Sequence, residues 1–170
     1  KPGALGLLAT PQHVFAATCV APACQASSAA SKGERSTPAQ AQQAMPLFAA
    51  GGLRRGEGLG IQFRDVAASD GQLRVRIRPN SSRRLKTVRG RRVITLPAHV
   101  TAVGGVDLAQ WVETERSRLK SSRLETAFVF SSADAPFDAK ARVEIADVCL
   151  RSMREVTGRS AARLHALRHL

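Results

Sequence analysis

The sequence predicts an α+β fold that is mainly helical, with a small antiparallel sheet of three strands at one side. Apolar residues alternate with arginines over residues 73–78, as in a half-buried strand, and apolar residues recur at helical spacing over 108–119 and 143–153. The chain has 170 residues, 44% of them hydrophobic, which is enough for one domain with its own core.

The amino-terminal segment 1–36 is rich in Ala and Ser and is interrupted by Pro11 and Pro22. We expect a partly disordered linker or the tail of an upstream segment, with a signal peptide as the alternative, followed by one domain over 37–170. The segment has no run of the roughly 18 apolar residues that a membrane span needs, so no membrane partner is expected.

The first expected helix follows the start signal Ser36-Thr37-Pro38 and runs through residues 39–50. Pro46 is expected to strain it, which allows two short pieces in place of one helix. Gly51-Gly52 would end it with a tight turn that presents Arg54 inward, and a second helix would begin over 55–63.

The sheet is predicted from the turn signal Asp70-Gly71 onward. After this turn one face of a strand should be buried and the other charged, because arginines alternate with Leu73, Val75 and Ile77.

A hairpin is expected after a break at 78–80. Its two arms would be segments 83–87 and 92–96, which flank Arg89-Gly90. Lys86 would then lie at or near the tip, where a long amine can reach a phosphate.

Two further helices are expected. Asp107 can cap one with the apolar stripe Leu108, Trp111, Val112 and Leu119. After a buried run at 128–130 and a loop at 133–137, a second helix would run from Ala139 to Thr157-Gly158 with the stripe Val143, Ala146, Leu150 and Met153.

Basic residues are concentrated in the middle of the chain. The whole sequence has 26 Lys and Arg against 13 Asp and Glu, and residues 51–100 hold twelve against three, a net +9 of the total +13. This predicts a polyanion partner, with nucleic acid as the first candidate. The three cysteines form no CxxC pair and have no matching His spacing, so no zinc site, disulfide framework or cofactor is expected.

Three motifs follow one another along the chain: Gly52-Leu53-Arg54-Arg55-Gly56-Glu57, Lys86-Thr87, and His165-Ala166-Leu167-Arg168-His169. With this order, and with LGIQFRDV after the first motif, the chain resembles the tyrosine recombinases, or phage-type integrases, over roughly residues 44–170. The resemblance implies a recombinase catalytic domain, double-stranded DNA as partner, a tetramer on paired DNA sites, and a cytoplasmic, nucleoid-associated protein.

The resemblance also implies catalytic roles. Cleaving a phosphodiester without a metal requires fixed cations around the phosphate, and Arg54 and Arg168 match the arginines of that clamp. His165 matches a histidine that hydrogen-bonds the phosphate, and Lys86 matches the lysine that protonates the departing 5′ oxygen.

Other residues would support this site. Glu57 matches an acidic residue that orients an arginine, and His169 matches a histidine that is more often structural. DNA phosphates would be gripped by further arginines, namely Arg55, Arg74, Arg76, Arg83, Arg84, Arg89 and Arg91.

The family's nucleophile is a tyrosine, which forms a phosphotyrosine intermediate, and this chain contains no Tyr. Because the chain starts without Met and ends one residue after the last motif, we expect a fragment, truncated at its C-terminus and inactive alone, with the tyrosine beyond Leu170. The alternatives are a non-catalytic DNA-binding remnant of a mobile element and a basic RNA-binding protein. Taken singly, Lys86 also fits a solvated cation and His165 a core histidine.

Overall fold

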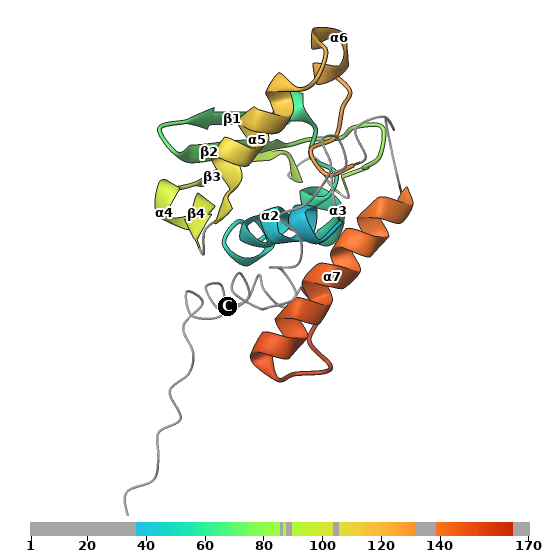
Figure 1. Cartoon of the computed structure of the whole chain (residues 1–170). Coiled ribbons are helices and arrows are strands. Elements are labelled where there is room, and N and C mark those ends of the chain that lie inside the picture. Colours follow the sequence, from blue (N-terminus) through green and yellow to red (C-terminus); the bar gives the residue numbers. More distant parts are fainter. Residues whose placement is uncertain (1–36, 86, 88–89, 104–105, 132–138, 165–170) are drawn as a thin grey trace, which may run out of the picture.

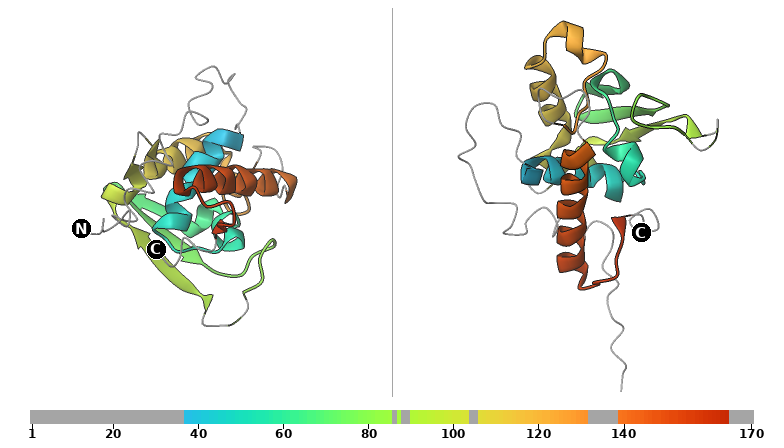
Figure 2. Two further views of the ribbon diagram at one scale, coloured as in Figure 1. Left: turned by 90° about the horizontal axis from the view of Figure 1, so that it is seen from below. Right: turned by 90° about the vertical axis from the view of Figure 1, so that its right-hand side faces the viewer.

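The structure, a computed structural model, describes residues 37–85, 87, 90–103, 106–131 and 139–164. Its main helices are α2 (Thr37–Ala49), α5 (Leu108–Ser117) and α7 (Ala139–Thr157). Figure 1 shows these helices around one side of a small sheet, and the right-hand view of Figure 2 shows the strands extending from the opposite side. The predicted combination of helices with a small antiparallel sheet is confirmed.

The sheet consists of β1 (Val66–Ser69), β2 (Gln72–Ile77) and β3 (Arg92–Leu96), antiparallel in that order. A two-residue turn joins β1 to β2, with φ of 51° at Asp70 and 69° at Gly71. Positive φ at both central residues is the geometry that Asp-Gly favours in tight hairpins, so this predicted turn is confirmed.

One face of the sheet is part of the core. Leu73, Val75 and Ile77 are at most 1% exposed, and Leu96 of β3 lies beside them at 2%. Helix α5 contacts β1 and β2, and its own buried residues Leu108 and Val112 join the same core. The alternation in the sequence therefore identified the buried face correctly.

Helix α2 packs along α7 and is a single helix that runs through Pro46. The expected division at Pro46 is wrong. The proline cannot donate a backbone hydrogen bond, but its ring is buried, and its carbonyl accepts from the N–H groups of Ala50 (3.0 Å) and Gly51 (3.2 Å) at the helix end.

The expected helix over 55–63 is also wrong. Only a single turn forms, α3 (Arg55–Gly58), followed by the 3₁₀ turn η2 (Phe63–Asp65). Glycines at positions 56, 58 and 60 explain the early end, because each costs a helix about 1 kcal/mol relative to alanine.

The hairpin arm expected over 83–87 is not a strand at its described residues. Asn80 and Arg83 instead close a tight turn, with backbone N···O distances of 3.0 and 3.2 Å in the two directions. The Asn80 side chain stabilises this turn by accepting from the N–H of Ser82 at 3.1 Å. The sheet's third strand is β1, and β2 pairs directly with β3.

The remaining elements follow the sequence pattern more closely. Asp107 caps α5 by accepting from the N–H of Gln110 at 2.9 Å, and residues 128–130 are buried. Helix α7 ends at Thr157, and the next residue, Gly158, has a φ of 64°. Val143 is 50% exposed, so its place in the buried stripe is wrong; the buried residues of α7 are Ile145, Ala146, Cys149, Ser152 and Met153.

Short elements connect these parts: α4 (Ala98–Thr101), β4 (Ala102–Val103), β5 (Val106–Asp107) and α6 (Ser121–Leu124). Trp111 of α5 is half-buried and stacks on Phe130 with ring centroids 5.6 Å apart. The expected segment 1–36 and the loop at 133–137 lie outside the described residues.

Candidate nucleic-acid interface

The candidate site begins at the turn between α2 and α3. Gly52 has a φ of 58°, a conformation that glycine adopts without strain, and Leu53 is buried at 1% exposure. Arg54 follows at the N-terminal end of α3 and is exposed. The turn therefore presents the Arg54 side chain outward, and the expectation of an inward side chain is wrong.

Glu57 is the buried acidic residue of this site, with a side chain only 9% exposed. Its Oε2 accepts from the backbone N–H of Arg54 at 2.9 Å, which caps the first turn of α3. The same carboxylate accepts two side-chain hydrogen bonds from Arg92, at 3.2 Å to Oε1 and 2.9 Å to Oε2. The arginine that pairs with Glu57 through its side chain is therefore Arg92.

The pKa of Glu57 reflects these contacts. Burial alone would raise the pKa of the carboxyl, but the hydrogen bond from Arg92, the Arg54 backbone N–H and the positive charges of both arginines together lower it. Glu57 is accordingly ionised at neutral pH, which keeps the ion pair intact.

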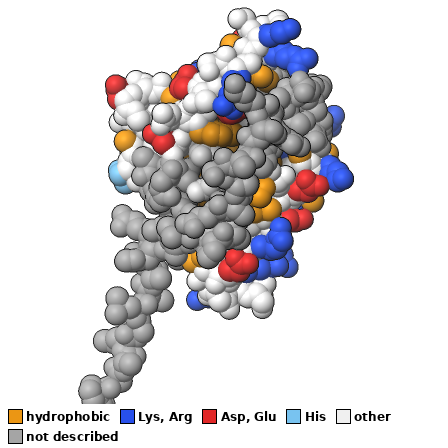
Figure 3. Space-filling view, viewed as in Figure 1, with side chains coloured by type: hydrophobic (Ala, Val, Ile, Leu, Met, Phe, Trp, Pro, Cys, Tyr) orange, Lys and Arg blue, Asp and Glu red, His pale blue; other side chains and the backbone are white. Residues whose placement is uncertain are grey.

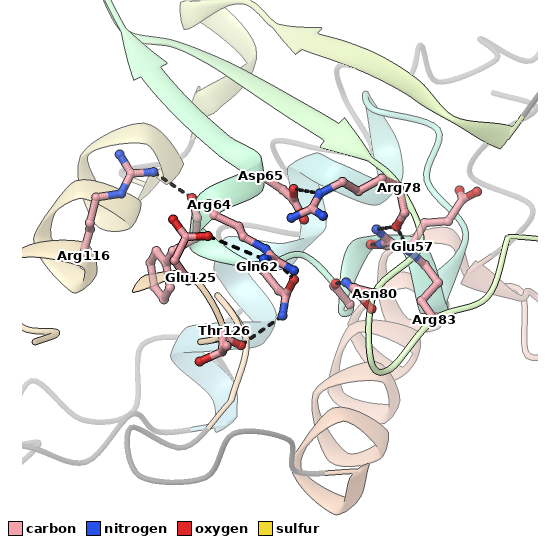
Figure 4. Close-up of polar contacts among 12 residues, drawn as sticks. Glu57, Gln62, Arg64, Asp65, Arg78, Asn80, Arg83, Arg116, Glu125 and Thr126 are labelled. Carbon is pink, nitrogen blue, oxygen red and sulfur yellow. Dashed lines mark hydrogen bonds and ion pairs between the residues drawn. The ribbon is translucent and has the colours of Figure 1, made fainter. Parts of the chain in front are cut away.

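A second group of contacts lies beside the first (Figure 4). Arg83 is only 7% exposed, and its guanidinium donates to the carbonyl of Glu57 at 2.7 Å and to the carbonyl of Arg78 at 2.6 and 3.1 Å. Arg78 in turn pairs with the buried Asp65. Burial lowers the pKa of Arg83 below its usual value, and the nearby Asp65 and Glu57 oppose this shift.

Arg83 therefore does not fit the expectation of a DNA contact. Its guanidinium points into the protein and holds the 80–83 turn against α3, because its donors are used by backbone carbonyls. Asn80 adds to this attachment by donating to the carbonyl of Gly60 at 2.7 Å. We therefore treat Arg83 as a structural residue.

The outer face of the sheet is a separate basic surface. Arg74 and Arg76 are exposed and pair across the strands with Thr95 and Val93, while Ala67 of β1 lies on the other side of Arg74. No strand residue on this fully described face is acidic. At the turn end, a hollow of about 370 Å³ is lined by Ala67, Ser69, Asp70, Gln72 and Arg74.

Arg54 and the outer-face arginines lie on different sides of the sheet. Arg92 pairs with Ile77 in the strand register, so both side chains project from the inner face, where Arg92 reaches Glu57. Arg76 alternates with Ile77 and projects from the outer face. The expected DNA contacts thus form two surfaces.

Three other predicted contacts are exposed: Arg55 in α3, Arg84 after the 80–83 turn, and Arg91 directly before β3. Figure 3 looks onto the helical side, where basic and acidic side chains are interspersed near α6 and α7. Five predicted site residues lie outside the described residues: the catalytic candidates Lys86, His165 and Arg168, the supporting His169 and the DNA contact Arg89.

Sequence reasoning missed Arg92. A signal was present, because Arg92 has the same strand parity as Ile94 and Leu96 and therefore belongs to the inner face. The ion pair between Asp65 and Arg78 was also missed, because no local sequence pattern indicates a contact between residues 13 positions apart.

Within the described ranges, no cluster of three or more His, Cys, Asp or Glu residues is arranged to hold a metal ion. No helix in that part of the chain combines the length and apolar character needed to cross a bilayer. Comparison with protein-family models, curated proteins and solved structures finds no match for this chain.

Proposed function

We propose that this chain is part of a tyrosine-type site-specific DNA recombinase, which breaks and rejoins DNA without a metal through a phosphotyrosine intermediate. In the complete protein, copies would assemble as a tetramer on paired DNA sites in the cytoplasm, at the nucleoid. Residues 37–170 would be part of the catalytic domain.

The observation that carries the proposal is the Glu57–Arg92 ion pair. Glu57 belongs to the first motif and caps the turn that begins at Arg54, and Arg92 opens the strand that follows the Lys86-Thr87 motif along the chain. The first motif is thus linked across 35 positions to the strand that begins six residues after Lys86, by a pair with a largely buried carboxylate.

The chemistry follows from the properties of the exposed Arg54. A guanidinium remains protonated and donates in a planar fork, so it can hold the charge that develops on a phosphate oxygen during strand cleavage. By the resemblance, Arg168 would complete the clamp, His165 would assist proton transfer and Lys86 would protonate the leaving oxygen.

DNA would be held mainly through its phosphates. The exposed Arg55, Arg84 and Arg91, together with the outer-face pair Arg74 and Arg76, provide cations without reading bases. Binding through such contacts weakens steeply as salt increases, because each neutralised phosphate releases condensed counterions.

The proposed reaction requires a tyrosine nucleophile, and the 170 residues include no tyrosine. The proposal therefore predicts that the coding sequence continues beyond Leu170 and encodes one. If it does not, the alternative function is non-catalytic DNA binding, which the exposed arginines also support.

The test is to express the protein encoded by the full reading frame and incubate it with nicked suicide substrates, looking for a covalent protein–DNA adduct. We expect an adduct that is lost when the downstream tyrosine is replaced by Phe or when Arg54 is replaced by Ala. An adduct that survives Arg54→Ala would refute the assignment of Arg54. A reading frame without a tyrosine would refute the recombinase proposal and leave DNA binding.

A further inference from the structure

Arg92 holds three segments of the site together. Its guanidinium donates to both carboxylate oxygens of Glu57, and it also donates to the carbonyl of Gly90 at 3.3 Å. Glu57 in turn caps the turn that starts at Arg54. Arg54 is therefore linked through Glu57 to Arg92 at the start of β3, and through Arg92 to Gly90 just before that strand.

We propose that Arg92 is a positioning residue that orients Arg54 toward a DNA phosphate. The inference rests on the proposed function, since it takes Arg54 to be the phosphate ligand. Arg92 itself is not assigned a contact with the DNA.

The first argument is that Arg54 depends on its backbone for its orientation. Among the described residues, no hydrogen bond or ion pair engages the exposed Arg54 guanidinium, whereas its backbone N–H is fixed by Glu57. The carboxylate of Glu57 has Arg92 as its side-chain partner. Releasing Arg92 would leave this carboxylate free to rotate away from the cap.

The second argument is that α3 has a separate attachment to the fold. Arg83 donates to the carbonyl of Glu57 at 2.7 Å and does not contact its carboxylate. This bond keeps α3 against the 80–83 turn when Arg92 is changed. Loss of Arg92 should therefore disturb the orientation of Arg54 more than the fold.

The third argument is geometric. Arg92 engages Glu57 with two different nitrogens, one for each carboxylate oxygen. A lysine has the same charge but presents a single ammonium group, so it cannot reproduce this two-point contact. The variant Arg92→Lys therefore keeps the positive charge of residue 92 but removes the two-point contact that orients the Glu57 carboxylate.

The experiment is a double-mutant cycle on the affinity of the 170-residue chain for a short DNA duplex at fixed salt. The variants are Arg54→Gln, Arg92→Gln, Arg92→Lys and the Arg54→Gln/Arg92→Gln pair, with Arg151→Gln on the exposed side of α7 as the charge control. Circular dichroism and melting temperature report whether each variant is folded.

We expect Arg54→Gln to weaken binding about tenfold, the scale of one charge-assisted hydrogen bond. Arg92→Gln and Arg92→Lys should each weaken it by a similar factor, and the double variant should bind no worse than Arg54→Gln alone, because both changes remove the same contact. Arg151→Gln should stay within about twofold of wild type.

The pH dependence provides a readout that loss of stability alone would not change. The groups facing the Glu57 carboxyl are Arg54, Arg83 and Arg92, and replacing Arg92 removes the hydrogen bond that counters burial. The pKa of Glu57 should then rise. The Arg54-dependent part of the wild-type affinity should be lost as the solution is acidified through the pKa of Glu57, whereas Arg92→Gln, in which that part is already lost, should show no such step.

The outcomes separate the two proposals. If Arg54→Gln has no effect on DNA affinity, Arg54 is not a phosphate ligand, and both the proposed site and this inference fail. If Arg54→Gln weakens binding but Arg92→Lys behaves as wild type, or if the two Gln substitutions are additive, only the positioning role of Arg92 is overturned.

Discussion

Replacing the buried Arg83 should destabilise the fold strongly, although the residue is a cation in a basic segment. The change Arg83→Met keeps most of the side-chain volume and removes the donors that serve the carbonyls of Glu57 and Arg78. Leaving the buried carbonyl of Glu57 and the partly buried carbonyl of Arg78 without these donors costs about 1–3 kcal/mol each. We therefore expect the free energy of unfolding to fall by about 3 kcal/mol.

The neighbouring exposed residue is the matched control. Arg84→Met removes the same charge one position along the chain, and a surface change of this kind should alter the free energy of unfolding by no more than about 0.5 kcal/mol. Urea unfolding can be followed by the fluorescence of Trp111, the one tryptophan of the chain. Arg83→Met should lower the midpoint at unchanged slope. Equal midpoints for the two variants would refute the structural role of Arg83.

Two further predictions concern Glu57 and Gly71. Because the pKa of Glu57 is lowered in the folded state, its ionised form contributes stability that is present above the unfolded value of 4.5 and is lost as the pH falls through the folded value. Glu57→Gln should therefore lower the melting temperature at pH 7 and make its decline below pH 4.5 shallower; an unchanged acid profile would contradict the pairing. Gly71→Ala should cost about 1–2 kcal/mol, because φ is +69° and the new Cβ would lie 3.1 Å from that of Ala98. Gly56→Ala, whose Cβ meets nothing within 4 Å, is the control, and equal costs would refute the turn argument.

The parts of the fold that could be predicted are those governed by local physics. The alternation over 73–77 gave the buried face of β2, Asp70-Gly71 gave the turn before it, and Asp107 gave the start of α5. Each signal concerns residues within a few positions of one another, where backbone geometry alone sets the pattern.

Two of the incorrect predictions arose where contacts outside the local segment decide the structure. Residues 83–87 have a composition typical of a strand. Arg83 instead points into the protein, where its guanidinium donates to the carbonyls of Glu57 and Arg78. Pro46 lies within a helix because the surrounding core covers its ring. Neither contact has a local signature in the sequence.

The candidate site was predicted in the same partial way. Motif order led to Arg54 and Glu57, and the structure adds the partner Arg92, which strand parity would have placed on the inner face. The inward orientation expected for Arg54 was wrong because the turn after Gly52 buries Leu53 and leaves the next side chain exposed.

The central claim is that exposed arginines bind duplex DNA through its phosphates, and its most direct test is the salt dependence of DNA affinity. For the wild-type chain, the logarithm of the association constant should fall linearly with the logarithm of salt concentration. Arg74→Gln/Arg76→Gln should reduce the magnitude of that slope by about 1.8, since each phosphate contact contributes about 0.9. Lys140→Gln/Arg151→Gln, which removes the same charge from exposed positions of α7, should leave the slope unchanged. A flat wild-type slope, or an equal loss in both double variants, would contradict the account.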